Sequence, residues 1–357
     1  MPRSPVTIRD VAARAGVSHQ TVSRVINSSE RVTPETRQRV EQAIAELGYQ
    51  PNAIARSMAD GRTYTLACIT PNLTDYTFAS LIEGAEIEAR LHGYFLLTAT
   101  APDAETFEML VRQMVTSRRT EGLLVINPYS DQRHEFLPKS VPLVFLGMRP
   151  RQEVGDSASI DEVQAGRLAT EHLISLGHRR IAHITGPLCE DCSQDRRAGY
   201  LDALQAAGIE PNPAWIAEGD WSATFGDEAT RAWLEQDAPI TAIFAQNDRM
   251  AVGAIRALRD YNRRVPEDVS VIGFDNIPLA SYFDPPLTTM FQDIQFIGRE
   301  AARLLIQRLE IPQAPLQHLQ YAAEVVVRCS TGPWRGGDQE RNDSGLHFQD
   351  STKPTNP

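Results

Sequence analysis

Four polar side chains gather near the start of the chain at a spacing that can read DNA. In the segment VSHQTVSRVIN (residues 17–27), Gln20, Ser23 and Arg24 are spaced i, i+3, i+4, and His19 precedes them. Gln can pair with adenine and Arg with guanine through two hydrogen bonds each, and His or Ser can contact a base or a phosphate. The same face can also be the solvated side of a small helical bundle. The pattern therefore supports DNA recognition, with a solvated face as the alternative.

A second set of polar residues follows apolar segments later in the chain. Asn247 follows TAIFAQ, Asp275 follows VSVIGF, and Asp75 lies after TLACIT. Arg196 lies in a helix that begins after HITGP, and Trp221 lies in EGDWSA. Open α/β sheets bind ligands at the carboxyl ends of their strands. Carboxylates and amides bind vicinal hydroxyls, Arg binds two oxygens and Trp stacks on a pyranose, so this set fits a sugar.

Each of these residues also has an ordinary structural role as an alternative. Asp275 can cap a turn, Trp221 can belong to the core, and Arg196 can pair with Asp195 at the surface. A purine or nucleoside is an alternative ligand. Such a ligand would favour aromatic side chains on both of its faces, but the sequence indicates only one, Trp221. The occurrence of the whole set at successive strand ends is what favours a ligand site.

The first set of residues must be positioned by short helices. TIRD (residues 7–10) is a capping box that begins one helix, Gly16 ends this helix, and Ser18 can cap the next. A third helix is predicted to begin at Thr-Pro (residues 33–34). Two short helices joined by a tight glycine turn are the arrangement of a helix-turn-helix.

The second set must be positioned by parallel sheets. From residue 64 onward, amphipathic helices alternate with apolar segments that are predicted strands: TLACIT, YFLLTAT, EGLLVIN, LVFLG, RIAHITG, TAIFAQN, VSVIGF and EVVVR. Such alternation predicts parallel sheets covered by helices on both faces, and these strands suffice for two lobes. The polar, glycine-rich segment after Ser330 is predicted to be disordered.

The charge of the chain is unevenly distributed. The net charge is −11, but residues 1–62 hold nine arginines and six acidic residues, which gives +3 there and −14 in the remainder. A basic head on an acidic body is typical of a phosphate-facing module fused to another domain.

Other classes of protein find little support. No apolar segment reaches a membrane-spanning length and the N-terminus lacks the apolar core of a signal peptide, so we expect a cytoplasmic protein and no membrane partner. Cys189 and Cys192 form a single CxxC, which can be a redox or metal site but is more simply a reduced loop. GxSxG, a P-loop and a metal quartet are missing, so we expect neither an enzyme nor a metal or cofactor. A solute-binding protein of a transport system is a further alternative, against which the head and the missing signal argue.

The segment from VTIRDVAARAGVSHQTVSRVIN to YQPNAIARSMADGRT closely resembles the DNA-binding head of the lactose-repressor family of bacterial transcription regulators. SLGHRRIAHITGP, EGDWSA, AQNDRMAVGAIRAL, VPEDVSVIGFDNI and PPLTTMFQDI resemble that family's sensor, in the same order. The resemblance extends from about Val6 to Ser330. It implies an N-terminal all-α helix-turn-helix head followed by an α/β sensor like the periplasmic binding proteins, with two Rossmann-like lobes and the ligand between them. It also implies a repressor of transcription whose affinity for operator DNA a small molecule controls.

The resemblance assigns roles to particular residues. Those expected to contact DNA are Thr7, Ser18, His19, Gln20, Thr21, Ser23, Arg24, Asn27, Asn52, Ala55 and Met58. Met58 falls where the family inserts an apolar side chain, Leu in many members, between the central base pairs. The alternative role for Met58 is a contact with the sensor. Those expected to contact the effector are Asp75, Asp161, Arg196, Trp221, Asn247, Asp275 and Gln292. One departure is Gly147, where several sugar-binding members have Asp.

The expected domains are a helix-turn-helix head, a hinge helix and linker, two sensor lobes and a disordered tail. Their expected bounds are 1–50 for the head, 51–62 for the hinge, 63–160 with 293–330 for the N-terminal lobe, 161–292 for the C-terminal lobe and 331–357 for the tail. One recognition helix reads too few base pairs for selectivity, so we expect a homodimer on palindromic operator DNA. The tail lacks leucine heptads that would favour a tetramer.

Overall fold

The computed structural model describes residues 6–26, 31–49, 62–116, 119–147, 149 and 155–335. Four of the expected DNA contacts lie outside these residues: Asn27, Asn52, Ala55 and Met58. The expected hinge, apart from Arg62, and the chain beyond residue 335 also lie outside them.

The head contains three helices, α1 (Ile8–Ala15), α2 (His19–Ile26) and α3 (Pro34–Leu47). The capping box of α1 is present: the Thr7 hydroxyl accepts from the Asp10 amide, and the Asp10 carboxylate accepts from the Thr7 amide at 2.7 Å. Gly16 ends α1 in the left-handed region, with φ 66°. The helices bury a small apolar core of their own around Val11, Val22 and Val40. The predicted helix-turn-helix is therefore confirmed.

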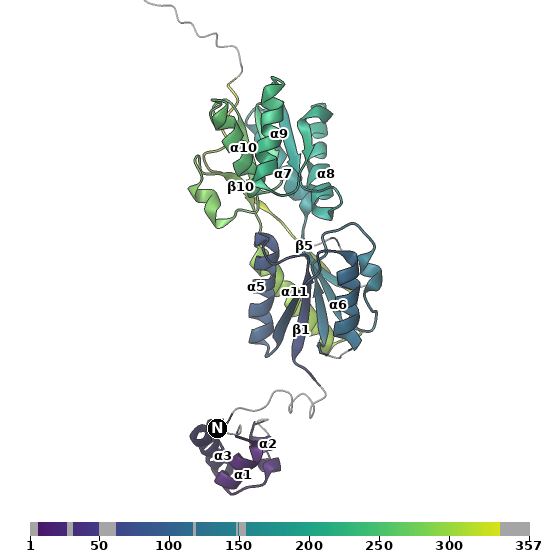
Figure 1. Ribbon diagram of the computed structural model, residues 1–357, viewed down its shortest axis with the longest axis vertical. Helices are drawn as coiled ribbons and strands as arrows, with labels where there is room; N and C mark the ends of the chain where they lie inside the picture. The colour runs from purple at the N-terminus through teal and green to yellow at the C-terminus, as the bar shows by residue number, and fades with distance from the viewer. Residues whose placement is uncertain are drawn as a thin grey trace, which may run out of the picture.

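The N-terminal lobe of the sensor is a parallel sheet between helices (Figure 1). Its strands lie in the order β11-β5-β4-β3-β1-β2, and every pairing is parallel. The strands are β1 (Thr65–Thr70), β2 (Phe95–Thr100), β3 (Gly122–Val125), β4 (Leu143–Leu146), β5 (Asp156–Ile160) and β11 (His318–Tyr321). The helices are α5 (Tyr76–Leu91), α6 (Ala104–Thr116) and α11 (Ile294–Glu310), with a 3-10 turn, η1 (Arg133–Phe136). Successive residues of β1 alternate between the core under α5 and α11 and the core under α6, so both faces of the sheet are covered.

The C-terminal lobe repeats this design. Its strands lie in the order β12-β10-β9-β8-β6-β7, and only the β10–β12 pairing within this described sheet is antiparallel. The strands are β6 (Ile181–Thr185), β7 (Ile216–Glu218), β8 (Ala242–Ala245), β9 (Ser270–Phe274), β10 (Thr288–Phe291) and β12 (Glu324–Val326). The helices are α7 (Glu162–Ser175), α8 (Asp191–Ala206), α9 (Ala223–Glu235) and α10 (Asp248–Asp260), with 3-10 turns η2 (Pro213–Trp215) and η3 (Pro278–Tyr282).

The chain passes between the lobes after β5, after β10 and again after β11. The third passage corrects the expectation that 293–330 belongs wholly to the N-terminal lobe, because β12 pairs with β10 of the other sheet. The expected start of a disordered tail at residue 331 is also wrong. The Trp334 amide donates to the Leu176 carbonyl at 2.8 Å, and its ring lies 6.2 Å from that of His178, so residues 331–335 pack on the C-terminal lobe.

Paired helices cross at glycines where no side chain would fit. A Cβ on Gly253 of α10 would lie 1.9 Å from the Ala223 carbonyl oxygen of α9. The pairs α7–α8 and α5–α11 are packed in the same way, through Gly166 and Gly298. These close crossings hold each helix pair rigidly on its sheet.

Candidate functional site

A cavity of about 270 Å³ lies between the two lobes, at the carboxyl ends of the strands. Five of the seven predicted effector residues line it: Asp75, Arg196, Trp221, Asn247 and Asp275. Asp75 comes from the N-terminal lobe and the other four from the C-terminal lobe, so the wall draws on both lobes.

The structure does not bring Asp161 and Gln292 to the cavity wall. Asp161 is the N-cap of α7, where its side chain accepts a hydrogen bond from the Gln164 amide at 3.0 Å. Gln292 is buried and donates its side-chain amide to Asp275 at 3.1 Å. It therefore orients a residue of the wall without belonging to it.

Arg196 is fixed by contacts on every side. It is only 4% exposed and forms a two-pronged ion pair with Glu162, with N–O distances of 2.7 and 3.0 Å. Its third nitrogen donates to the Gln246 carbonyl at 2.7 Å, and the guanidinium lies 3.6 Å from the centre of the Phe274 ring. The alternative pairing with Asp195 does not occur, because Asp195 pairs with Arg149 at 2.6 Å.

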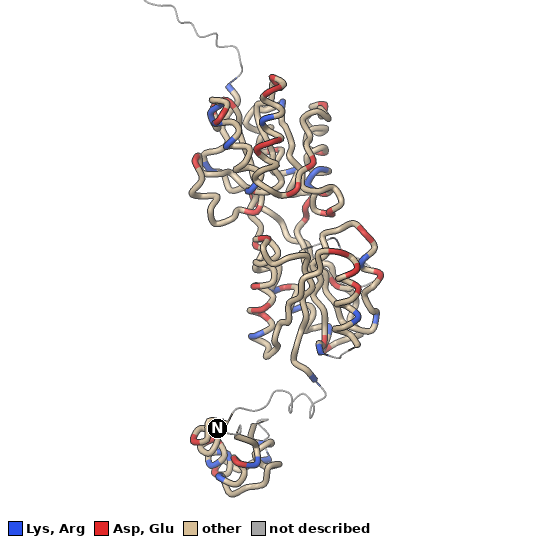
Figure 2. The backbone as a smooth tube through the Cα atoms, viewed as in Figure 1, with Lys and Arg blue, Asp and Glu red and all other residues tan. Residues whose placement is uncertain are grey.

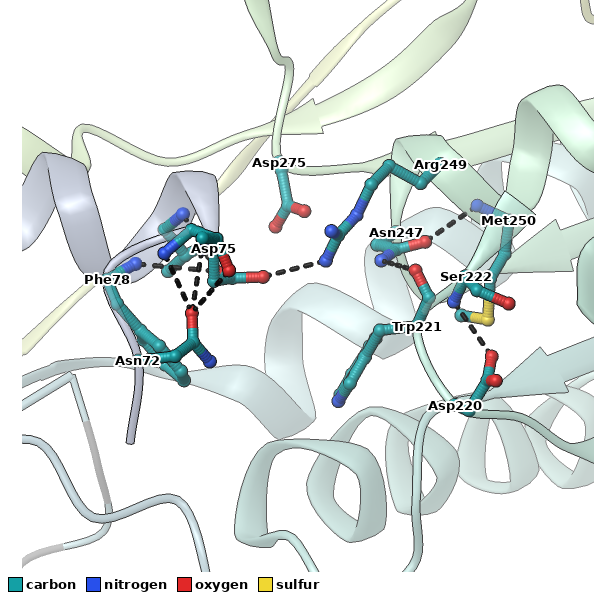
Figure 3. A network of polar contacts seen from close by, with 12 residues as sticks. Asn72, Asp75, Phe78, Asp220, Trp221, Ser222, Asn247, Arg249, Met250 and Asp275 are labelled. Carbon is teal, nitrogen blue, oxygen red and sulfur yellow. Dashed lines mark hydrogen bonds and ion pairs between the residues drawn. The ribbon is translucent and has the colours of Figure 1, made fainter. Parts of the chain in front are cut away.

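One ion pair in the cavity wall joins the two lobes directly. Asp75 caps α5 with one carboxylate oxygen, which accepts from the Thr77 amide at 2.9 Å, and with the other it accepts from Arg249 of α10 at 2.7 Å. Figure 3 shows Arg249 extending across the cavity to Asp75, with Asp275 pointing toward the pair. The pair therefore connects the two lobes at the edge of the cavity.

Trp221 is locked in place by its own backbone and by two neighbours. Its φ is 67°, a left-handed conformation that is rare for a large residue. Its carbonyl accepts from the side-chain amide of Asn247 at 3.0 Å, and its indole N–H donates to Glu190 at 3.1 Å. Asn247 in turn caps α10 by accepting from the Met250 amide at 2.8 Å. The indole ring is thus presented to the cavity in one orientation.

Burial perturbs the acids of the cavity. It raises the pKa of Glu190 to about 7, and it raises the pKa of Asp275 well above its usual range. Both carboxyls therefore keep their protons to higher pH than free carboxyls do.

Other residues of the wall were not predicted: Phe78, Tyr129, Glu162, Glu190, Cys192, Asp220 and Arg249. Most of them lie in loops or first helical turns beside a predicted residue, as Glu162 follows Asp161 and Asp220 precedes Trp221. Proximity to a predicted residue was the only signal the sequence held for Glu162, Asp220 and Arg249, whereas Cys192 belongs to the CxxC.

The cysteines of the CxxC are both free. Cys189 is exposed, whereas Cys192 lines the cavity, and burial raises the pKa of the Cys192 thiol well above its usual range. Among the described residues, no group of three His, Cys, Asp or Glu side chains is placed to hold a metal ion. The cavity thus presents a neutral thiol to a ligand.

Gly147 also lines the cavity, with φ 72°. A Cβ there would lie 2.9 Å from a methyl group of Leu81. An Asp at this position would be strained in the present backbone.

The polar face of α2 is presented to solvent. His19, Gln20 and Arg24 are exposed, while Val22 and Val25 on the opposite side are buried. Ser18 caps α2 by accepting from the Thr21 amide at 3.2 Å, and Thr21 and Ser23 are partly exposed. Figure 2 shows basic residues distributed over the head, and acidic residues on both lobes of the sensor. The side chains that are predicted to read bases are therefore exposed on one face of α2.

No described helix has both the length and the apolar character needed to cross a membrane. A helix-turn-helix head joined to a two-lobed sensor with an interlobe cavity defines a class of protein, the DNA-binding regulator controlled by a small molecule.

Comparison with known proteins gives the family. Residues 7–52 match the model for bacterial regulatory proteins of the lacI family, and residues 170–331 match that for the periplasmic binding protein-like domain. The transcriptional repressor PurR of Aliivibrio salmonicida is 35% identical over 330 residues, which cover 91% of this chain and 98% of PurR. The transcriptional regulator CelR of Thermobifida fusca is 37% identical over 316 residues, which cover 85% of this chain and 92% of CelR.

Solved structures agree with this result. The Lac repressor dimer bound to operator and the anti-inducer ONPF superposes with a TM-score of 0.83 at 32% identity, over 92% of this chain and all (100%) of that chain. The complex of CelR with cellobiose gives a TM-score of 0.71 at 35% identity, over 91% of this chain and 99% of that chain. The chain belongs to the lacI family of bacterial regulatory proteins. It is a DNA-binding regulator of transcription with a small-molecule sensor, as the sequence predicted.

Proposed function

We propose that the chain is a repressor that binds palindromic operator DNA as a homodimer and responds to a sugar or glycoside in the interlobe cavity. The observation that carries the proposal is the composition of this cavity, in which a fixed indole, an arginine, an amide and carboxylates converge from both lobes. Polar groups of these types bind vicinal hydroxyls, and an indole face covers the apolar side of a pyranose. The relative CelR has been solved with cellobiose, a sugar.

Control of DNA affinity follows from the two-lobed design. A ligand that touches Asp75 on one lobe and Asn247 and Asp275 on the other favours the closed arrangement of the lobes. The N-terminal lobe follows the head in the chain, so closure changes how two heads of a dimer are presented to DNA. The coupling is reciprocal, because DNA must change the affinity for effector by the same factor, typically about 5- to 150-fold.

A purine or nucleoside is a second candidate effector. Phe78 and Tyr129 also line the cavity, so a base has more than one aromatic surface to contact. Several relatives at 34 to 37% identity are named PurR. These observations keep the purine alternative open, although the carboxylates and amide remain better matched to hydroxyls.

The test is a thermal-shift screen of monosaccharides, disaccharides, glycosides, nucleobases and nucleosides on the full-length protein. A ligand that binds only the folded state raises the melting temperature by mass action. Asp275→Asn should abolish the shift and preserve binding to DNA selected from a randomised pool, while the surface variant Glu171→Gln should retain both. A hit among nucleobases with none among sugars would overturn the ligand class, and a hit that survives Asp275→Asn would place the binding site elsewhere.

A further inference from the structure

The cavity wall carries more acidic than basic residues. Its acids are Asp75, Glu162, Glu190, Asp220 and Asp275, and its bases are Arg196 and Arg249. The wall therefore has three more carboxyl groups than guanidinium groups. Figure 2 also shows acidic positions at the ends of the two lobes that face each other.

Both arginines of the wall are already neutralised. Arg196 is paired with Glu162 at 2.7 Å, and Arg249 is paired with Asp75 at 2.7 Å. Each guanidinium already faces a carboxylate of the protein, so its charge is offset before a ligand anion enters. A phosphate or carboxylate on the effector would face a wall that offers it no spare positive charge.

The other three carboxyls are bonded only to neutral donors. Glu190 accepts from the Trp221 indole at 3.1 Å, Asp275 from the Gln292 amide at 3.1 Å, and Asp220 from the Ser222 backbone at 2.9 Å. None of the three forms an ion pair with any described residue. Glu190 and Asp275 are partly buried, whereas Asp220 is exposed. A partly buried carboxylate without a directly paired cation is costly, so a positive charge entering beside Glu190 and Asp275 would be stabilised.

Aromatic surfaces of the wall suit the same charge. Trp221, Phe78 and Tyr129 line the cavity beside the carboxyls. An ammonium group is attracted to the face of an aromatic ring, most strongly to that of Trp, and carboxylates with aromatic rings are a usual setting for cationic ligands. Arg133 already lies 3.9 Å from the centre of the Tyr129 ring, and Arg196 lies 5.9 Å from the centre of the Trp221 ring. Two rings of the wall therefore already face cations of the protein.

Resting on the proposed function, we infer that the effector is a polyhydroxylated compound that carries an ammonium group, an amino sugar or an aminocyclitol, and that sugar phosphates are rejected. The hydroxyls bind Asn247 and the wall acids, the ring stacks on Trp221, and the ammonium is matched by Glu190, Asp220 and Asp275.

The protonation of Glu190 supports this charge match. Burial raises the pKa of Glu190 to about 7, and nearby Asp75 raises it further while Arg196 opposes the change. An ammonium that enters beside Glu190 takes the place of its proton. Binding of the amine should therefore release protons near pH 7, whereas binding of a neutral sugar should release fewer.

The experiment is titration calorimetry of the full-length protein with matched ligands. Glucose, galactose and mannose are each compared with the 2-amino, the N-acetylated 2-amino and the 6-phosphate derivative. We expect at least one 2-amino sugar to bind 10-fold or more tightly than its neutral and N-acetylated counterparts, with no binding of any 6-phosphate. Titration in two buffers of different ionisation enthalpy should show more protons released with the amine than with its neutral counterparts.

Variants of the wall then test whether its carboxyl groups cause the preference for the amine. Glu190→Gln and the more exposed Asp220→Asn should each lower the amine preference about 3- to 10-fold, and Glu171→Gln on the outer surface of α7 should leave it unchanged. Equal or tighter binding of a neutral or N-acetylated sugar, binding of a 6-phosphate, or no binding by any member of the panel would each overturn the inference.

The same samples separate this inference from the proposed function. Binding to the selected DNA, and its change with ligand, are measured beside each titration. A neutral sugar that alters DNA binding would refute the charge preference and leave the sugar-responsive repressor intact. A protein that binds no selected DNA would refute the repressor itself, whatever the calorimetry shows.

Discussion

Arg196→Ala should destabilise the C-terminal lobe by about 3–5 kcal/mol, the range for removing one partner of a buried ion pair. The Glu162 side chain, 12% exposed, would be left without its cation, and the Gln246 carbonyl would lose a charged donor. The ring of Phe274, which the guanidinium covers, would face a void. These losses overlap, so their individual values are not added.

A paired substitution distinguishes the buried charge from the lost packing. Glu162→Gln with Arg196→Met removes both charges and keeps most of the volume, so it should cost about 1–2 kcal/mol, since an apolar replacement of a buried pair is often nearly neutral. The matched control is Arg167→Ala, whose pair with Glu171 is 43% and 42% exposed and should contribute about 0–1 kcal/mol.

The assay is urea denaturation followed by tryptophan fluorescence. All four tryptophans lie in the C-terminal lobe, at positions 215, 221, 233 and 334, so their signal reports the unfolding of this lobe. A loss below about 1 kcal/mol for Arg196→Ala, or a paired variant less stable than the single one, would refute the view of Arg196 as a structural support of the cavity.

Three further outcomes are expected. Arg24→Ala should weaken binding to the cognate DNA by roughly 1–3 kcal/mol and relax the preference at one base pair in a selection from randomised DNA, and an unchanged preference would exclude base reading. Burial lowers the pKa of His183 to about 3, so the unfolded chain takes up its proton first and stability falls as the pH drops from 6.5 toward 3. Between pH 7 and pH 5 the wild type should therefore lose about 2 kcal/mol more than His183→Gln in urea denaturation, and parallel profiles would contradict this. Gly253→Ala should cost about 1–3 kcal/mol or more because its Cβ would meet the backbone of α9, and a stability equal to wild type would show that the two helices can separate.

The sequence predicted the elements that bury long apolar side chains. Each apolar segment expected to be a strand forms one, and in β1, β3, β4, β6, β8 and β9 the apolar side chains fill the cores. The edge strand β2 is an exception, because its Phe95 is 72% exposed. It did not predict β5, whose sequence DSASI is small and polar although every residue is buried. It also missed β7, β10 and β11, which are three or four residues long and gain their pairing from neighbours in space.

Of the cavity wall, the sequence predicted mainly residues that lie just after strands. Asn247 and Asp275 follow strands, and the carboxyl ends of strands meet wherever parallel sheets form. Arg249 and Glu190 were missed because their place in the wall depends on how one lobe lies against the other. The position of one lobe against the other depends on three segments that connect them, and the sequence indicated only the two near residues 161 and 292.

The three passages between the lobes also constrain the order in which the protein can be completed during synthesis. The C-terminal lobe is translated almost whole, from α7 to β10, before α11 and β11 of the N-terminal lobe exist. Strand β12 then returns to the C-terminal sheet as one of its last described elements. A ribosome stalled near residue 290 would carry two incomplete sheets, each with an uncovered edge or face open to wrong pairing. The effector cavity therefore matures only after β12 has been made, and nascent chains should be unable to respond to the effector until residues beyond 326 have emerged.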